Sequence, residues 1–135
     1  MKTKLAIMFA TAGAMLVPPM WAHHAFTSEF DGHHPIKLQG VVKKMEWINP
    51  HAWIHLDVKD ASGNVNTWMI ECGTPNTLLR KGLTKTSVVP GTEILVEGYQ
   101  AKSGKNVANG RDVTFTDGRK LFLGSSNPSL DTEKK

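Results

Sequence analysis

Two pairs of adjacent histidines lie near the start of this chain, in the stretch VPPMWAHHAFTSEFDGHHPI from Val17 to Ile36. The first pair is His23 and His24, and the second pair is His33 and His34. Imidazole nitrogen binds zinc, copper and other transition metals, and short histidine-rich tracts are typical of metal-binding segments. The alternative is that both pairs are solvated side chains of a polar segment. Metal binding is therefore the first chemistry to consider, with the solvated alternative left open.

The first 22 residues have the pattern of a secretory signal peptide. Lys2 and Lys4 precede an uncharged apolar run from Leu5 to Val17, and the small residue Ala22 follows shortly after it. The run is 13 residues long, whereas a helix needs about 20 apolar residues to span a bilayer. We therefore expect cleavage after Ala22, export of the chain, and no membrane span in the mature protein.

Cleavage after Ala22 makes His23 the N-terminal residue. Its free α-amine and its own imidazole then form a chelating pair, and the amine has a pKa of about 8 in peptides, so a divalent ion displaces its proton near neutral pH. A nitrogen-rich ligand set favours Cu(II) among the common divalent ions. We expect a non-catalytic copper site with zinc as the alternative ion. The candidate ligands are His23, His24 and His51, with His55, His33 and His34 as secondary candidates.

The segment HAWIHLDV, His51 to Val58, has the clearest alternation of apolar and polar residues in the chain. In a strand, alternation places His51, Trp53 and His55 on one face, pointing away from the core. The two histidines lie about 13 Å apart along an extended strand, and metal bonds to imidazole nitrogen are only about 2 Å long. At most one of them is therefore expected to join any given metal site.

A second hypothesis assigns this face to a partner rather than to a metal. An adaptor of the oligonucleotide/oligosaccharide-binding (OB) type would bind a peptide, glycan or partner protein there, since such barrels bind through strands two and three. The expected contact residues are Trp47, Asn49 and Trp53 beside the two histidines.

A third hypothesis, a zinc-dependent hydrolase, requires three histidines, an open water position and a general base. Glu29, Asp31 and Asp57 are the candidate bases. The chain contains no HExxH, GxSxG, GxxxxGK[ST] or GxGxxG motif. We therefore expect a binding protein and no enzyme.

Hydrophobic residues recur with a period of two along most of the chain, which predicts an all-β domain with one short helix. The first strand is expected from Pro35, with a bulge near Lys43-Lys44, and a hairpin at Asp60–Asn64 joins the next two. Thr74 is expected to cap a helix of about two turns, with Leu78 and Leu79 as its apolar contacts.

The rest of the chain predicts a fourth strand, a loop and a final hairpin. The expected strand covers Thr92–Ala101, the expected loop covers Lys102–Gly110, and Asp117-Gly118 marks the hairpin turn. The order strand, strand, strand, helix, strand, strand predicts a five- to six-stranded OB-like Greek-key barrel, with a small β-sandwich as the alternative.

Length and charge limit the remaining possibilities. Removing residues 1–22 from 135 leaves 113, the size of one domain. The expected parts are the signal peptide 1–22, a histidine-rich arm 23–34, the barrel 35–126 and a tail 127–135. The precursor has 16 Lys and Arg against 12 Asp and Glu; losing Lys2 and Lys4 leaves 14 against 12, a net charge of +2. So small a charge argues against nucleic acid as a partner.

The single cysteine, Cys72, excludes an intramolecular disulfide and is expected to be buried.

Several segments together resemble a family of small exported bacterial proteins known as domain of unknown function 6152. The most specific of them are the paired histidines in AHHAF, Ala22–Phe26, and the Trp-x-Asn-Pro-His motif in GVVKKMEWINPHAWIHLDV, Gly40–Val58. GTPNTLLRKG, Gly73–Gly82, and GRKLFLGSS, Gly118–Ser126, also match. The resemblance implies a periplasmic location and one small β-rich domain, and it implies no activity.

Overall fold

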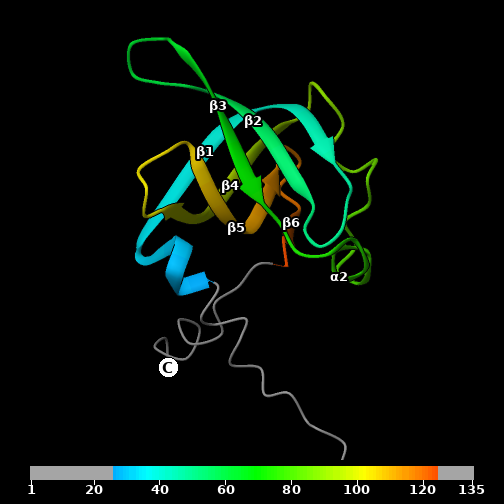
Figure 1. The fold of residues 1–135 in the computed structure, drawn as a ribbon. Coiled ribbons are helices and arrows are strands. Elements are labelled where there is room, and N and C mark those ends of the chain that lie inside the picture. Colours follow the sequence, from blue (N-terminus) through cyan, green and yellow to red (C-terminus); the bar gives the residue numbers. More distant parts are fainter. Residues whose placement is uncertain (1–25, 125–135) are drawn as a thin grey trace, which may run out of the picture.

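The structure, a computed structural model, describes residues 26–124 (Figure 1). A helical turn at residues 26–29, called the N-terminal turn below, leads into the first strand. The strands and the helix are β1 (Phe30–Glu46), β2 (Trp53–Lys59), β3 (Val65–Glu71), α2 (Pro75–Arg80), β4 (Glu93–Ala101), β5 (Val107–Phe115) and β6 (Lys120–Phe122).

The strands close into a barrel of the predicted OB-like topology. The sheet order is β3-β2-β1-β4-β5-β6, and a parallel pairing of β3 with β5 joins the two sides. The ring therefore runs β1, β2, β3, β5, β4 and back to β1, and the long first strand pairs with both β2 and β4. This confirms the expected fold class, with the Asp117-Gly118 turn adding the short β6 to the outside of the ring.

Alternation along β2 places its apolar residues inside the barrel, as predicted. Ala52, Ile54 and Leu56 are fully buried, and Val58 packs partly against the same core. The first strand keeps this phase until the expected bulge, where its register against β2 shifts between Val42 and Lys44. Cys72 is also fully buried, and burial raises the pKa of its thiol, so this cysteine acts as a core residue.

The helix α2 packs against the core through Leu78. The Thr74 side chain accepts a hydrogen bond from the Thr77 amide at 3.2 Å, the N-cap that the sequence predicted. Leu78 and Leu83 are fully buried in the core, whereas Leu79 is 50% exposed, so the prediction that Leu79 is a core contact was wrong. A helix this short buries one narrow stripe, and the adjacent position faces solvent. Within residues 26–124 no helix is long and apolar enough to cross a membrane.

The fifth strand begins earlier than the sequence suggested. We expected a loop over Lys102–Gly110, but β5 starts at Val107 because Val107, Ala108 and Asn109 pair in parallel with β3. The strands pack very closely here: a Cβ on Gly98 would lie 2.0 Å from the Asn109 carbonyl oxygen. Asn109-Gly110, a dipeptide that is common in turns, therefore lies in β5 where the pairing of β5 with β3 closes the barrel. We call this pairing of β3 with β5 the seam.

Glu97 links three strands on the outside of the barrel, and its effect on stability is testable. It lies 3.0 Å from Lys37 of β1 and 2.8 Å from Lys120 of β6, and these hydrogen bonds lower its pKa from 4.5 to about 2. A lowered pKa stabilises the folded state above pH 4.5, and that stabilisation is lost as the pH falls through about 2. We expect Glu97→Gln to lower the melting temperature at pH 6 but not near pH 2, as measured by circular dichroism. Glu93→Gln, at the exposed start of the same strand, is the control and should show no such pH dependence.

Candidate functional site

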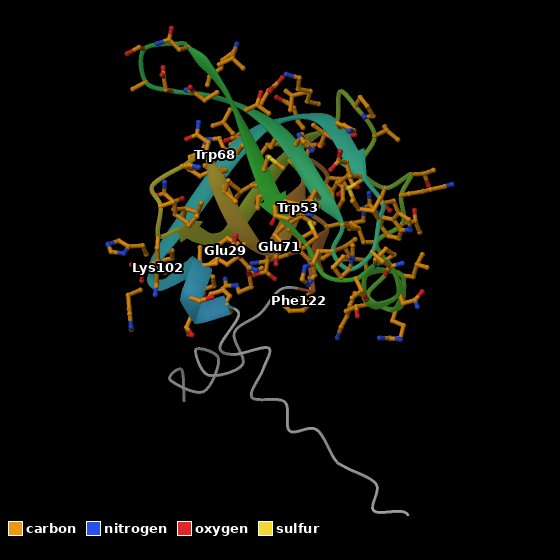
Figure 2. All side chains as sticks on the ribbon, viewed as in Figure 1. Glu29, Trp53, Trp68, Glu71, Lys102 and Phe122 are labelled. Atoms are coloured by element: carbon orange, nitrogen blue, oxygen red, sulfur yellow. The ribbon has the colours of Figure 1, made fainter. Side chains whose placement is uncertain are left out.

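Five residues, one from each strand of the closed ring, form a continuous row around the outside of the barrel. Register pairing connects Glu46 to Trp53, Trp53 to Glu71, Glu71 to Asn109, and Asn109 to Tyr99. Paired residues point to the same side of a sheet, and the next row, Ile54, Ile70 and Ala108, is the buried inner one. We call the five residues the outer row. Figure 2 shows Trp53 and Glu71 close together on the neighbouring strands β2 and β3.

His51 and Glu71 form a close pair beside this row. His51 lies just before β2, and its Nδ1 atom is 3.6 Å from Oε1 of Glu71. The Glu71 side chain is only 13% exposed, whereas that of His51 is 45% exposed. Burial raises the pKa of Glu71 above its usual 4.5, the charge of His51 opposes this rise, and the charge of Glu29 adds to it. The result is a carboxylate shielded from solvent with an accessible imidazole against it.

The N-terminal turn packs against the other end of the outer row. The Phe26 ring contacts the Tyr99 ring edge-on at a centroid distance of 5.7 Å, and it also contacts Phe30. The Glu29 carbonyl accepts a hydrogen bond of 2.9 Å from the Lys102 amide. β1 therefore begins at Phe30 and not at Pro35, because aromatic packing and this bond hold the chain on the barrel. Part of segment 23–34, expected to be an arm, thus belongs to the barrel wall.

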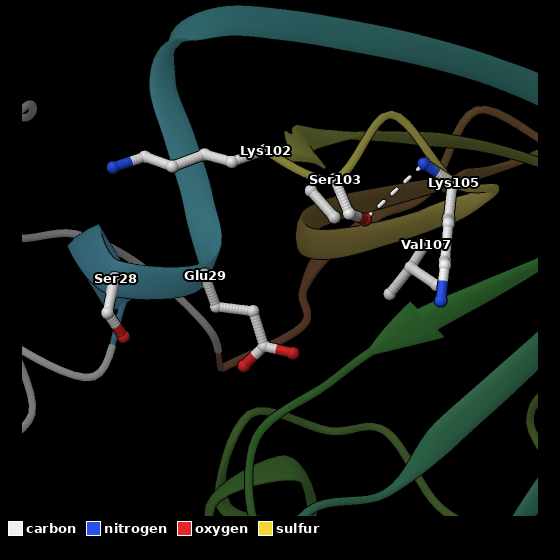
Figure 3. A pocket seen from close by; sticks show the side chains of 7 residues that line it. Ser28, Glu29, Lys102, Ser103, Lys105 and Val107 are labelled. Carbon is white, nitrogen blue, oxygen red and sulfur yellow. Dashed lines mark hydrogen bonds between the residues drawn. The ribbon is translucent and has the colours of Figure 1, made fainter.

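A hollow of about 570 Å³ lies between the N-terminal turn and the β4–β5 loop. Its lining residues come from both segments: Ser28, Glu29, Ala101, Lys102, Ser103, Lys105 and Val107. Figure 3 shows the Glu29 side chain extending from the turn with its carboxylate on the β3 side of the hollow. Because Glu29 raises the pKa of Glu71, the two carboxylates are electrostatic neighbours. The Glu29 carboxylate, which lines the hollow, therefore acts electrostatically on Glu71.

His55 lies beside a different carboxylate, that of Glu46. Its Nε2 atom is 3.4 Å from Oε2 of Glu46 without hydrogen-bond geometry, and that nitrogen is buried and has no hydrogen-bond partner among residues 26–124. Glu46 also bonds Lys44, and Lys44 and His55 lower its pKa. The His55 side chain is 20% exposed, so it is more covered than a solvent-facing strand position would be. His51 and His55 thus belong to two different carboxylate pairs.

The second histidine pair lies on the exposed start of β1. Nδ1 of His34 is 2.6 Å from Oδ2 of Asp31, and the His33 amide donates to Oδ1 of the same carboxylate at 2.9 Å. These two bonds lower the pKa of Asp31. Both histidines are exposed, and their local partner is Asp31 rather than the outer row.

The remaining predicted site residues lie around the corner before β2. Trp47 was expected on the partner-binding face, and it packs partly against the core. Asn49 is exposed at a cis Asn49-Pro50 peptide, and Trp53 is partly buried within the outer row. His23 and His24 lie outside the described residues. No group of three or more His, Cys, Asp or Glu side chains that could hold a metal occurs within residues 26–124.

Two polar residues of this site, Glu71 and Asn109, were not predicted from the sequence. Glu71 directly precedes Cys72 in the sequence, and Cys72 was expected to be buried. Because neighbouring residues of a strand point to opposite faces, the alternation did contain the signal that Glu71 faces outward. Asn109 carried no such signal, because its position depends on the pairing of β5 with β3. The two residues are direct partners in that pairing.

The fold and the outer row define a small closed OB-like barrel with a His–carboxylate pair on its surface. A family model described as "Family of unknown function (DUF6152)" matches residues 12–110, and the chain belongs to this family. No curated protein and no solved structure matched the chain.

Proposed function

We propose that the mature protein is an exported, periplasmic copper-binding protein that holds or transfers the ion without catalysing a reaction. Its ligands are His23 with its free α-amine, His24, and His51 of the barrel surface. Zinc is the alternative ion. Signal-peptide cleavage after Ala22 provides the free amine, so export and metal binding are linked in this proposal.

The observation that carries the proposal is the position of the N-terminal turn. Phe26 packs on Tyr99, which is joined through Asn109 to Glu71, the partner of His51. Two strand spacings separate Tyr99 of β4 from Glu71 of β3, a distance of about 10 Å. Three residues of extended chain reach about 10 Å, so a chain that starts at His23 is long enough to bring its first residue to this pair.

The chemistry of the pair also supports a metal ligand at His51. Metal-binding histidines almost always donate their second ring nitrogen to a carboxylate or carbonyl, which fixes the ring and raises its basicity. Glu71 stands at the Nδ1 side of His51, which leaves Nε2 for an ion. An amine with two or more imidazoles is a nitrogen-rich set of the kind that Cu(II) prefers.

Copper titration of protein purified from the periplasm with its native N-terminus tests this proposal. We expect mass spectrometry to show a chain that begins at His23, and isothermal titration to show one Cu(II) bound with submicromolar affinity. His23→Ala keeps the amine but removes its imidazole, and should weaken binding at least about tenfold. A mature chain with another first residue, or micromolar copper left unbound, would contradict the proposal.

A second candidate function is an adaptor that binds a peptide, glycan or protein on the β2–β3 surface. It is favoured by Met69, which is 37% exposed directly opposite His55, because exposed methionine is common at adaptable binding surfaces. A partner retained by the metal-free protein, lost with Trp53→Ala and kept with His23→Ala, would favour this function over copper binding.

A further inference from the structure

The hollow between the N-terminal turn and the β4–β5 loop has the size of a small-molecule site. Its volume of about 570 Å³ lies within the roughly 300–1,000 Å³ that is usual for ligand pockets. All of its lining residues belong to the described part of the chain, residues 26–124. They carry carboxylate, ammonium and hydroxyl groups beside the apolar side chains of Ala101 and Val107. A ligand in this hollow would therefore contact charged and apolar groups together.

Hydrogen bonds to the backbone hold the two walls of the hollow in place. The Lys102 amide donates a hydrogen bond of 2.9 Å to the Glu29 carbonyl, and the Lys102 ammonium donates another to the Thr27 carbonyl. Within the β4–β5 loop, the Lys105 carbonyl accepts a hydrogen bond of 3.4 Å from the Gln100 side chain. These bonds give the hollow fixed walls, as ligand pockets usually have.

Opposite charges lie on the two walls and do not pair with each other. The Glu29 carboxylate extends from the N-terminal turn, the Lys105 ammonium extends from the loop, and both lie on the β3 side of the hollow (Figure 3). Neither charged group has a hydrogen bond or an ion pair with any residue between 26 and 124. The Lys102 side chain points away from both of them. Two charges of opposite sign therefore remain available to a ligand.

Apolar surface lies beside the two charges. Val107 lines the hollow and is partly buried, and its register partner on β3 is Met69, which is 37% exposed. Paired residues point to the same side of a sheet, so apolar surface continues from the hollow onto β3. The hydrocarbon part of a ligand would remove this surface from water, which favours binding.

We infer that the hollow binds a small zwitterion whose ammonium and carboxylate are joined by an apolar spacer, with the ammonium at Glu29 and the carboxylate at Lys105. Short apolar peptides and ω-amino acids both have this chemistry. The hollow contains none of the proposed copper ligands, so the inference does not depend on the proposed function. Both charged side chains are exposed, and exposed ion pairs contribute little, so we expect a Kd of about 1 mM.

A nuclear magnetic resonance titration of the metal-free protein tests this inference. The probes are ω-amino acids of increasing length around 6-aminohexanoate, and hexylamine and hexanoate are the analogues with one charge. We expect one length to bind about fivefold more tightly than either analogue and to shift the amide signals of Lys105 and Val107. Trialanine, compared with its N-acetylated and C-amidated forms, applies the same test to peptides. Whichever of the two classes binds more tightly identifies the source of the zwitterion.

Glu29→Gln and Lys105→Gln each remove one charge from the hollow. Each should weaken the binding of the best zwitterion about fivefold with little change in melting temperature, because both side chains are exposed. Exchanging the charges in the double variant Glu29→Lys/Lys105→Glu should restore binding with the ligand reversed. Glu93→Gln and Lys85→Gln, at exposed positions outside the hollow, are the matched controls and should bind like the wild type.

Two results would overturn the inference. The first is that no zwitterion of either class binds more tightly than its analogues with one charge. The second is that the best zwitterion keeps its full affinity for both Glu29→Gln and Lys105→Gln, since the charges of the hollow would then play no part in binding. A protein that binds no copper would contradict the proposed function and leave this inference standing.

Discussion

Replacing His51 with alanine is expected to weaken Cu(II) binding by more than about 100-fold, because it removes a metal ligand, whereas the loss of an outer-shell partner costs 10- to 100-fold. The side chain is 45% exposed and precedes β2, so the barrel should keep its stability. Competition titration against a chromophoric chelator measures the affinity, and thermal denaturation of the metal-free protein checks the fold.

His34→Ala is the matched control for this experiment. It makes the same substitution at an exposed histidine whose ring is held by Asp31, and we expect copper affinity within about threefold of the wild type, far less than a lost ligand would cost. Equal losses for the two variants would show that histidine content rather than position governs binding. A His51→Ala variant that keeps full copper affinity would show that the barrel surface provides no ligand.

Ile54→Asp is expected to unfold the domain. Ile54 is fully buried and lies between Met45 of β1 and Ile70 of β3 in the sheet register. An unpaired carboxylate there costs more than about 4 kcal/mol, a large part of the 5–15 kcal/mol that stabilises an ordinary domain. Far-ultraviolet circular dichroism in a urea titration measures the loss.

His55→Ala, one position along the same strand, provides the contrast. Its ring nitrogen is buried beside Glu46 without a hydrogen bond, so removal of the ring should cost less than about 1 kcal/mol. An unfolded His55→Ala variant together with a stable Ile54→Asp variant would mean that the two faces of β2 are reversed. The outer row, and the site built on it, would then not exist.

The proposed site joins parts of the chain that are far apart in sequence. Phe26, which holds the N-terminal segment on the barrel, comes from the N-terminal turn, His51 from the corner before β2, and Glu71 from β3. In Figure 1 the N-terminal turn and the β3–β5 seam lie at the same end of the barrel. A site of this kind exists only when the barrel is closed, so copper should bind the folded form preferentially and raise its melting temperature.

Local patterns in the sequence were sufficient for most of the fold. The alternation in His51–Val58 identified the buried face of β2, and the turn residues at Asp60–Asn64 and Asp117-Gly118 identified two hairpins. Thr74 marked the start of α2 through its hydrogen bond to the Thr77 amide. Each of these signals acts between residues close in sequence, where side-chain direction and backbone geometry are coupled directly.

Other features depended on contacts between distant segments. The start of β1 at Phe30 depends on Tyr99 and Ala101 of β4, and the start of β5 depends on its parallel pairing with β3. Asn109-Gly110 resembles a turn to any local rule, and only barrel closure makes Asn109 the neighbour of Glu71. Alternation alone places a carboxylate on an outer face, but it does not decide which strand lies beside it. That choice belongs to the packing of the whole barrel, which is why the histidines were visible in the sequence and the place of Asn109 beside Glu71 was not.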